Sequence, residues 1–407
     1  MAKYLFGNVY FYDDYVGILR EEPGSRVSFT YDLDYLERKN ARPLSVTLPL
    51  QKENFISEAG LLPYFDNLVA EGWLENAQKR LLGQRLASRF ELLLAFGWDC
   101  IGAVSIRDPE KIVVVDDLLD LKDLKEIALQ AQRASLSGVQ PKMAVIEKNG
   151  KFYPSKSHEL SSHIAKFPSP QHDDIVLNEY LSTRAFAALL SADLTVQMDL
   201  KVLEGFQEPA LLIQRFDREY DLKNKKYIKK HFEEFNQILN FPSDFKYQGA
   251  YMDMAAWINQ QGMMTENYLL YQRILAGFLL GNTDMHFKNF ALFHGSEGLR
   301  LTPSYDQVSA VLYEYKTIAL EIAGLKNLKV GELKAKHCIQ LGFDFGISRE
   351  LINHAVKQLE IKLPLALQAI ESSPYGGMKL KNKLTHWMEK RWNGTFALIG
   401  KSLSKKP

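Results

Sequence analysis

Short runs of alternating apolar and polar residues dominate the first hundred positions, and this period is typical of strands with one buried face. Glu22-Pro23-Gly24 is a turn signal between two such runs, and Gly97 ends a run with helical spacing. The expected elements are strands over 9–19, 27–31 and 103–106 and helices over 58–82 and 89–96. The pattern therefore predicts a small α+β region at the start of the chain.

From residue 135 the pattern changes to a second set of strands. Asn149-Gly150 is a type I′ hairpin signal between two of them. The expected strands are 143–147, 151–154, 162–167, 200–203 and 210–216, with one helix over 175–190. After Arg218 we expect a mostly helical chain, with a strand over 299–302. The apolar helix expected over 268–280 is too short and too polar to span a bilayer, so we interpret it as a core helix.

This order of elements predicts an α+β, protein-kinase-like fold of two lobes, with an additional N-terminal α+β subdomain. The expected segments are 1–108 for the subdomain, 125–216 for an antiparallel-sheet lobe that carries one helix, and 217–407 for an α-rich lobe. An acidic stretch over 116–123 separates the first two segments. In such a fold a nucleotide binds between the lobes.

The composition of the chain agrees with the predicted kinase-like fold but does not distinguish it from other globular folds. The chain has 407 residues, 46% hydrophobic and 24% charged, with a net charge of +1. These values are ordinary for globular proteins and predict no general attraction to nucleic acid or acidic lipid. The N-terminus shows no apolar signal core, and Cys100 and Cys338 form no metal-spaced cluster. We expect a protein of a reducing cytoplasm, or of its site of action if exported.

Three polar residues after the apolar helix indicate phosphoryl transfer. Asn289 follows Asp284 by five residues, and Asp306 follows Asn289 by seventeen. Phosphoryl transfer needs a carboxylate that orients the attacking hydroxyl and oxygen ligands for magnesium. We expect Asp284 to be the catalytic base, Asn289 and Asp306 to hold Mg²⁺, and His286 to brace the loop. A lone D-x-x-x-x-N match also occurs in unrelated polar turns, so the placement after a helix and before a strand matters.

Lys166 ends an expected strand, and Glu179 lies thirteen residues later on the next helix. A strand lysine that contacts nucleotide phosphates and is held by a helix glutamate is the arrangement of kinases. The same residues equally suit a solvated lysine at a strand end and a surface glutamate.

A polar loop before the hairpin is the candidate phosphate loop, although it matches neither glycine-rich phosphate motif. Gln214 and Phe216 end the last strand, where backbone groups could pair with adenine. Ser135 and Ser137 carry hydroxyls close to the expected terminal phosphate, so either could be self-phosphorylated. The candidate nucleotide contacts in the loop are Ser137, Gly138, Val139, Gln140 and Lys142.

Other polar stretches carry weaker signals. Asp217 and Arg218 are expected to form structural ion pairs. The lysine-rich stretch over 223–230 is expected to be a solvated loop. His231-Phe232-Glu233-Glu234 does not match H-E-x-x-H, and no second ligand is spaced for zinc.

Taken in order, these motifs resemble the HipA-type serine/threonine kinases, the toxins of bacterial toxin–antitoxin systems. The resemblance covers nearly the whole chain. It rests on 41–45, 48–50, 65–68, 102–104, 137–142, Lys166, 178–179, 215–218, Asp284 with His286, Lys288 and Asn289, and 305–306.

The resemblance implies an ATP- and magnesium-dependent kinase that phosphorylates a protein serine, in the family's best-known case on an aminoacyl-tRNA synthetase, and so arrests growth. It also implies self-phosphorylation at Ser135 or Ser137. The implied partners are a protein substrate and a small HipB-like helix-turn-helix antitoxin, with operator DNA reached only through that antitoxin and no membrane.

The chain departs from the family at two positions. Pro141 stands where the loop commonly has Glu, which removes one backbone amide, and Gln214 replaces a common hinge glutamate. Two alternatives stay open: a small-molecule kinase of the aminoglycoside or choline type, whose loop is similar, and a non-catalytic scaffold that binds the antitoxin.

Overall fold

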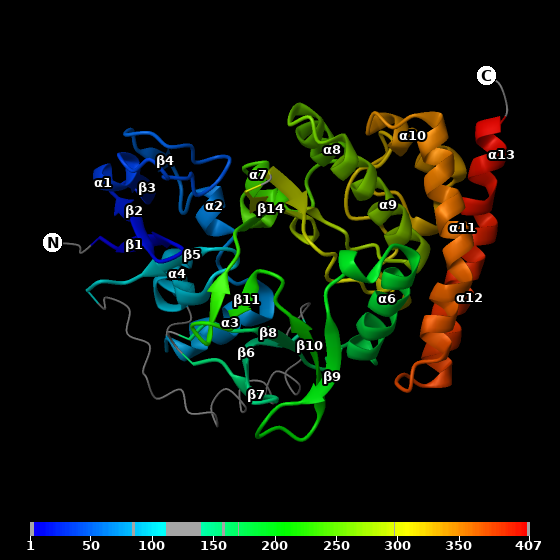
Figure 1. The fold of residues 1–407 in the computed structure, drawn as a ribbon, viewed down its shortest axis with the longest axis horizontal. Coiled ribbons are helices and arrows are strands. Elements are labelled where there is room, and N and C mark those ends of the chain that lie inside the picture. The colour runs from blue at the N-terminus through cyan, green and yellow to red at the C-terminus, as the bar shows by residue number, and fades with distance from the viewer. Residues whose placement is uncertain are drawn as a thin grey trace. The chain divides into compact units, whose positions relative to one another are not determined.

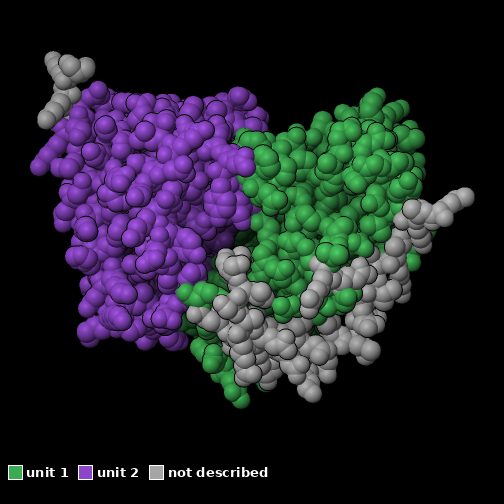
Figure 2. Space-filling model, turned by 180° about the vertical axis from the view of Figure 1, so that it is seen from behind, with its two compact units in different colours: residues 1–171, 200–245, 292–299 green, residues 172–199, 246–291, 300–407 purple. Residues whose placement is uncertain are grey.

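A computed structural model of the chain describes residues 4–83, 86–110, 140–156, 159–169, 171–296 and 298–404. The chain forms two compact units, each assembled from separate stretches of sequence (Figure 2). The first unit comprises residues 1–171, 200–245 and 292–299, and the second comprises 172–199, 246–291 and 300–407. The linear boundaries expected above for three domains stay a prediction.

An antiparallel sheet with the order β4-β3-β2-β1-β5 opens the first unit (Figure 1). The prediction of one strand over 9–19 was wrong, because the chain reverses at Tyr12, whose φ is +56°, and forms a hairpin. The strands are β1 (Phe6–Phe11), β2 (Asp14–Glu22), β3 (Arg26–Tyr31), β4 (Phe55–Ser57) and β5 (Val104–Arg107).

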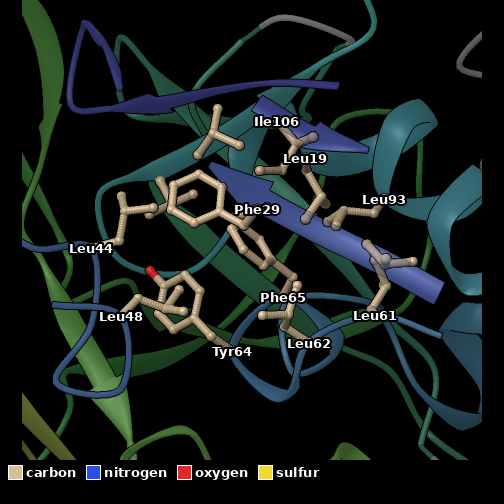
Figure 3. Packing of buried hydrophobic residues seen from close by; sticks show 14 of the residues in the cluster. Leu19, Phe29, Leu44, Leu48, Leu61, Leu62, Tyr64, Phe65, Leu93 and Ile106 are labelled. Carbon is tan, nitrogen blue, oxygen red and sulfur yellow. The ribbon is translucent and has the colours of Figure 1, made fainter. Parts of the chain in front are cut away.

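Short helices cover this sheet and enclose its core. The single helix expected over 58–82 is instead two, α2 (Pro63–Asp66) and α3 (Gly72–Leu81), and Gly72 at the start of α3 has a φ of +59°, which a continuous helix does not allow. The helix α4 (Arg89–Phe96) begins and ends where the sequence predicted, with Ser88 and Glu91 forming a capping box. A further short helix is α1 (Leu33–Leu36). Phe29, Phe65 and Leu93 meet in the buried cluster between these elements (Figure 3).

A second antiparallel sheet of the first unit has the order β7-β6-β8-β10-β9. The Asn149-Gly150 turn is as predicted, with φ values of +55° and +75°. Val145, Ala165 and Leu212 pack on one face of the sheet into a small core. The strands are β6 (Lys142–Lys148), β7 (Lys151–Pro154), β8 (His163–Lys166), β9 (Met198–Val202) and β10 (Pro209–Gln214).

The helices predicted after Arg218 begin only after a further set of strands. A hairpin of β11 (Arg218–Asp221) and β12 (Lys226–Lys229) comes first, followed by β13 (Phe232–Glu234) and α7 (Phe235–Ile238). The tip of this hairpin is solvated as expected, but Lys229 is not. Its ammonium donates to the carbonyl of Val104 (2.8 Å) and the hydroxyl of Ser105 (2.7 Å), and burial lowers its pKa to about 8.

Helices build the second unit, and α6 and α11 run side by side within it. Lys362 of α11 donates to the carbonyl of Leu190 (2.5 Å) at the end of α6. The helices are α6 (Ile175–Leu189), α8 (Tyr251–Gln260), α9 (Met264–Leu280), α10 (Ala335–Asp344), α11 (Arg349–Glu371), α12 (Met378–Gly394) and α13 (Ile399–Ser404). The strands β14 (Ala291–Gly295) and β15 (Gly298–Leu301) follow the loop after α9. Across the described residues, no helix is both long enough and apolar enough to cross a membrane.

Candidate active site

The loop that carries the candidate catalytic residues starts where α9 ends. Gly281 closes the helix with a left-handed φ of +81°. A Cβ atom at this position would lie 2.5 Å from Nε1 of Trp387 and 2.6 Å from Cγ1 of Val311. Glycine is therefore required here twice, by the backbone conformation and by the close approach of α12.

Asn282 connects this loop to the segment that carries Asp306. The side chain is almost fully buried, and its amide group donates to the backbone carbonyl of Asp306 and to Oε1 of Gln307, both at 3.2 Å. Its Oδ1 accepts the backbone N–H of Asp284 at 3.1 Å. One buried amide thus fixes the two acids of the candidate site relative to each other.

Asp284 is exposed to solvent, and the hydroxyl of Tyr247 donates to its Oδ1 at 2.9 Å. Desolvation by the surrounding protein raises the pKa of the Asp284 carboxyl, and the negative charge of Asp306 adds to the rise. The Tyr247 hydrogen bond and the positive charge of Lys246 act in the opposite direction. A solvent-accessible carboxylate with a raised pKa has the character of a general base.

His286 and Asn289 hold the loop in shape. The backbone N–H of His286 donates to Oδ1 of Asn289 (3.1 Å), and the backbone N–H of Asn289 donates to the carbonyl of His286 (2.9 Å). The ring of His286 is buried and lies edge-on to the ring of Tyr247, with centroids 5.0 Å apart. The bracing role expected for His286 stays a prediction.

Asp306 has a left-handed φ of +54°, which is uncommon for a residue with a side chain. Such conformations cluster at functional sites, where the surrounding structure enforces them. Nδ2 of Asn289 lies 3.4 Å from Oδ2 of Asp306, so the two proposed metal ligands are neighbours. A carboxylate beside a side-chain amide matches the oxygen donors that Mg²⁺ prefers.

Two lysines face each other in the second sheet of the first unit. Lys142 on β6 and Lys166 on β8 are direct partners in the antiparallel register. They share the face opposite the core that contains Ala165, because side chains alternate along a strand. The register thus places the two candidate phosphate-contacting lysines on one face of this sheet.

The remaining candidate nucleotide residues are dispersed. Nε2 of Gln140 donates to the carbonyl of Phe167 (3.1 Å), which ties the end of the candidate phosphate loop to β8. Gln214 is exposed at the end of β10, and the ring of Phe216 lies 4.9 Å from that of Phe232. Ser135, Ser137, Gly138 and Val139 lie outside the described residues.

The expected pair of Lys166 and Glu179 falls on different units. Lys166 ends β8 in the first unit, and Glu179 is buried on α6 in the second. Their pairing stays a prediction.

Asp217 and Arg218 form an ion pair, as the sequence suggested, and Arg215 joins them in one cluster. Nη2 of Arg215 lies 2.7 Å from Oδ2 of Asp217, and Nη1 of Arg218 lies 2.8 Å from the same oxygen. Both arginines also pair with Asp99, at 3.0 and 2.7 Å. Burial acts to raise the pKa of Asp217, but the two arginines outweigh it and hold the pKa at about 2.

His231, Glu233 and His294 are close enough to hold a metal ion, with one ligand atom of each within 4.8 Å of the others. Sequence spacing gave no signal for His294. The carboxylate of Glu233 already accepts the hydroxyl of Ser45 at 2.5 Å. Nδ1 of His231 accepts the N–H of Ala103 (3.5 Å), so in the neutral ring Nε2 carries the proton and offers no lone pair. We therefore assign this cluster a structural role.

Sequence reasoning missed two residues of the candidate site. Asn282 had a local signal, because it stands between a helix-ending glycine and the candidate base. Tyr247 had none, because it lies 37 residues before Asp284, and only the fold brings them together.

Comparison with known proteins identifies the family. Residues 7–107 match the family model of the HipA N-terminal domain, and residues 134–366 match that of the HipA-like C-terminal domain. The chain belongs to the HipA family. The resemblance inferred from the motifs is thereby confirmed, and it includes the N-terminal region.

Relatives align with the chain over most of its length. A Sinorhizobium fredii protein that carries the provisional name of a kinase is 27% identical and aligns over 91% of this chain and 96% of its own length. The serine/threonine-protein kinase toxin HipA of Shewanella oneidensis is 24% identical, with 81% of each chain covered. A solved Shewanella oneidensis structure of HipA with HipB and operator DNA matches 97% of this chain and 99% of its counterpart, with a TM-score of 0.76 and 20% identity. The predicted α+β, kinase-like HipA fold is confirmed.

Proposed function

We propose that this HipA-family protein is an ATP- and Mg²⁺-dependent serine/threonine protein kinase that acts as a growth-arresting toxin in the bacterial cytoplasm. The observation that carries the proposal is the approach of Asn289 and Asp306 to 3.4 Å, beside a loop whose carboxylate, Asp284, stays open to solvent. A base and two neighbouring side chains that carry ligand oxygens are the protein groups that phosphoryl transfer needs. The related kinases named above support the same reaction class.

Each proposed residue has one task. Asp284 orients the attacking hydroxyl and accepts its proton, and His286 keeps the loop in register. Asn289 and Asp306 would hold Mg²⁺, which neutralises phosphate charge when bound. Lys142 and Lys166 attract the phosphates, and Glu179 orients Lys166. Backbone groups near Gln214 and Phe216 pair with the adenine edge. Ser137, Gly138, Val139 and Gln140 form the phosphate loop, in which Ser135 or Ser137 receives phosphate when the protein modifies itself.

Mass spectrometry of the purified protein tests the chemistry. After incubation with ATP and Mg²⁺, we expect phosphate on the peptide that contains Ser135 and Ser137. Asp284→Asn should lower the rate of incorporation by about 10²- to 10⁴-fold, the usual contribution of a general base. Asp193→Asn, which changes an exposed acid of the same unit, is the matched control. If wild type and Asp284→Asn incorporated phosphate equally, Asp284 would not be the base.

A substrate screen separates the protein kinase from the alternatives. With radiolabelled ATP, we expect label on protein in a cell extract. Label on a cationic small molecule alone would indicate an aminoglycoside- or choline-type kinase. The absence of any transfer, with intact ATP, would indicate a scaffold.

We also propose a HipB-like helix-turn-helix partner, through which the protein reaches operator DNA. The support is the fold shared with the HipA that was solved together with HipB and its operator DNA. A small helix-turn-helix protein encoded beside this chain should co-purify with it. Binding of operator DNA by this chain without that partner would contradict the proposal.

A further inference from the structure

Residues 246–250 form a strap that is fastened to the candidate catalytic loop at its start. The backbone N–H of Phe287 donates to the carbonyl of Lys246 at 3.2 Å. At the other end, the carbonyl of Gly249 accepts the N–H of Glu321 at 2.9 Å. A Cβ on Gly249 would lie 2.7 Å from Cζ of Phe287, so the strap and the loop are in tight contact.

Tyr247 lies between these two anchors and bears on the candidate base. Its hydroxyl donates to Oδ1 of Asp284, and its ring lies edge-on to His286 at an interplanar angle of 88°. The ammonium of Lys246 lies 5.5 Å from the centre of the tyrosine ring, which steadies the ring further. The backbone anchors set the position of the phenol, so it can in turn set the position of Asp284.

A carboxylate base must direct one oxygen at the substrate hydroxyl. Rotation of the carboxylate group lowers the fraction of time that this oxygen spends in the reactive orientation. The hydroxyl of Tyr247 donates a hydrogen bond to Oδ1 of Asp284. Among the described residues no other hydrogen bond to the side-chain oxygens of Asp284 is present. Oδ2 therefore remains for a hydroxyl that approaches from solvent.

From this geometry, and resting on the kinase function proposed above, we infer that Tyr247 is a positioning residue that fixes the Asp284 carboxylate so that Oδ2 meets the attacking hydroxyl. Tyr247 contacts neither nucleotide nor substrate in this role. Its effect falls on the transfer step and not on ATP binding.

The test compares Tyr247→Phe with wild type in phosphate incorporation from radiolabelled ATP with Mg²⁺, measured on the chain itself and on casein. The variant keeps the ring that packs on His286 and loses only the hydroxyl. We expect the maximal rate to fall on the order of tenfold, a misorientation effect, with the ATP concentration for half-maximal rate unchanged. The midpoint of thermal unfolding, Tm, should stay within about 1 °C of wild type, since the lost bond is exposed.

Tyr313→Phe is the matched control in the same unit. Its exposed hydroxyl donates to the carbonyl of Asp173 (3.0 Å), and its ring contacts that of His172 with centroids 5.0 Å apart. It should leave rate and ATP dependence unchanged. A rate for Tyr247→Phe equal to wild type, or faster, would overturn the inference, since the phenol would then be idle or a block. A parallel loss of ATP affinity and Tm would indicate a merely structural role. Absence of incorporation by wild type would instead overturn the kinase function and this inference with it.

Discussion

Two sets of aspartates in this protein have opposite surroundings. Asp99 and Asp217 in the first unit are enclosed by Arg215 and Arg218. Asp284 and Asp306 in the second unit face each other's charge, and Asp284 is open to solvent. The pKa of Asp217 is held at about 2, whereas that of Asp284 is raised.

The difference separates acids that stabilise the fold from acids that serve chemistry. A carboxylate whose oxygens are all paired with arginine cannot accept a substrate proton or bind a metal ion. A carboxylate that is open to solvent and has a raised pKa, as Asp284 has, is available for reaction. The contrast can be tested by substitutions in each set.

Breaking the enclosed set, in which Asp99 and Asp217 pair with Arg215 and Arg218, should have the largest effect on stability. Arg215→Met leaves Asp217 and Asp99 with less positive charge in a buried place, and we expect a loss of about 3–5 kcal/mol in the free energy of unfolding. Urea unfolding followed by circular dichroism measures it. Arg38→Met, which breaks the exposed pair with Asp14, should cost at most about 1 kcal/mol. Similar losses in both variants would show that the buried cluster contributes no more to stability than an exposed ion pair does.

Changing the open set, Asp284 and Asp306, should instead reduce the stabilisation that bound ATP and Mg²⁺ give to the folded protein. Asp306→Asn removes a charged ligand, so the stabilisation by ATP and Mg²⁺, about 2–3 kcal/mol at a hundredfold excess over Kd, should largely disappear. Thermal-shift titration with and without EDTA measures this. The variant without ligand should unfold near the wild-type Tm. A wild-type shift in the variant would remove Asp306 from the metal site.

Acid should weaken the enclosed set over a defined range of pH. Because the folded-state pKa of Asp217 lies below its ordinary value of 3.8, its stabilisation is complete above pH 3.8 and is lost as pH falls towards 2. The contribution is roughly 2 kcal/mol. Asp217→Asn should therefore show a shallower fall in Tm between pH 5 and pH 2 than wild type. Parallel curves would contradict the assignment.

The smallest expected effect has the opposite sign. Since the pKa of Asp284 is raised in the folded protein, its charged form opposes folding at neutral pH. Asp284→Asn should accordingly have a Tm at pH 7 equal to or slightly above that of wild type, although we expect it to slow phosphate transfer. Calorimetry at pH 7 measures the sign. A clear drop in Tm would show that Asp284 also has a structural role.

Local sequence predicted the elements whose boundaries are chemically marked. The helix ended by Gly97 and the hairpin at Asn149-Gly150 were correct because capping and positive φ are local requirements. The turn at Tyr12 was missed because tyrosine at positive φ gives no local signal. The hairpin at 218–229 was missed because its strands are polar and largely exposed.

The residue types of the candidate site could be predicted from the sequence, but the hydrogen bonds that connect them could not. Spacing was enough to name Asp284, Asn289 and Asp306, because their chemistry restricts the residue types. The hydrogen bond from Asn282 to the carbonyl of Asp306 and the one from Tyr247 to Asp284 depend on tertiary structure. The register that sets Lys142 opposite Lys166 likewise could not be derived from strand patterns alone.

The tight fit of Gly281 against the indole of Trp387 gives the protein an intrinsic optical probe. Tryptophan emission responds to the groups that surround the ring, and this ring borders the point where the candidate catalytic loop leaves its helix. A variant that retains Trp387 and replaces the other four tryptophans with phenylalanine would let fluorescence follow that loop in real time.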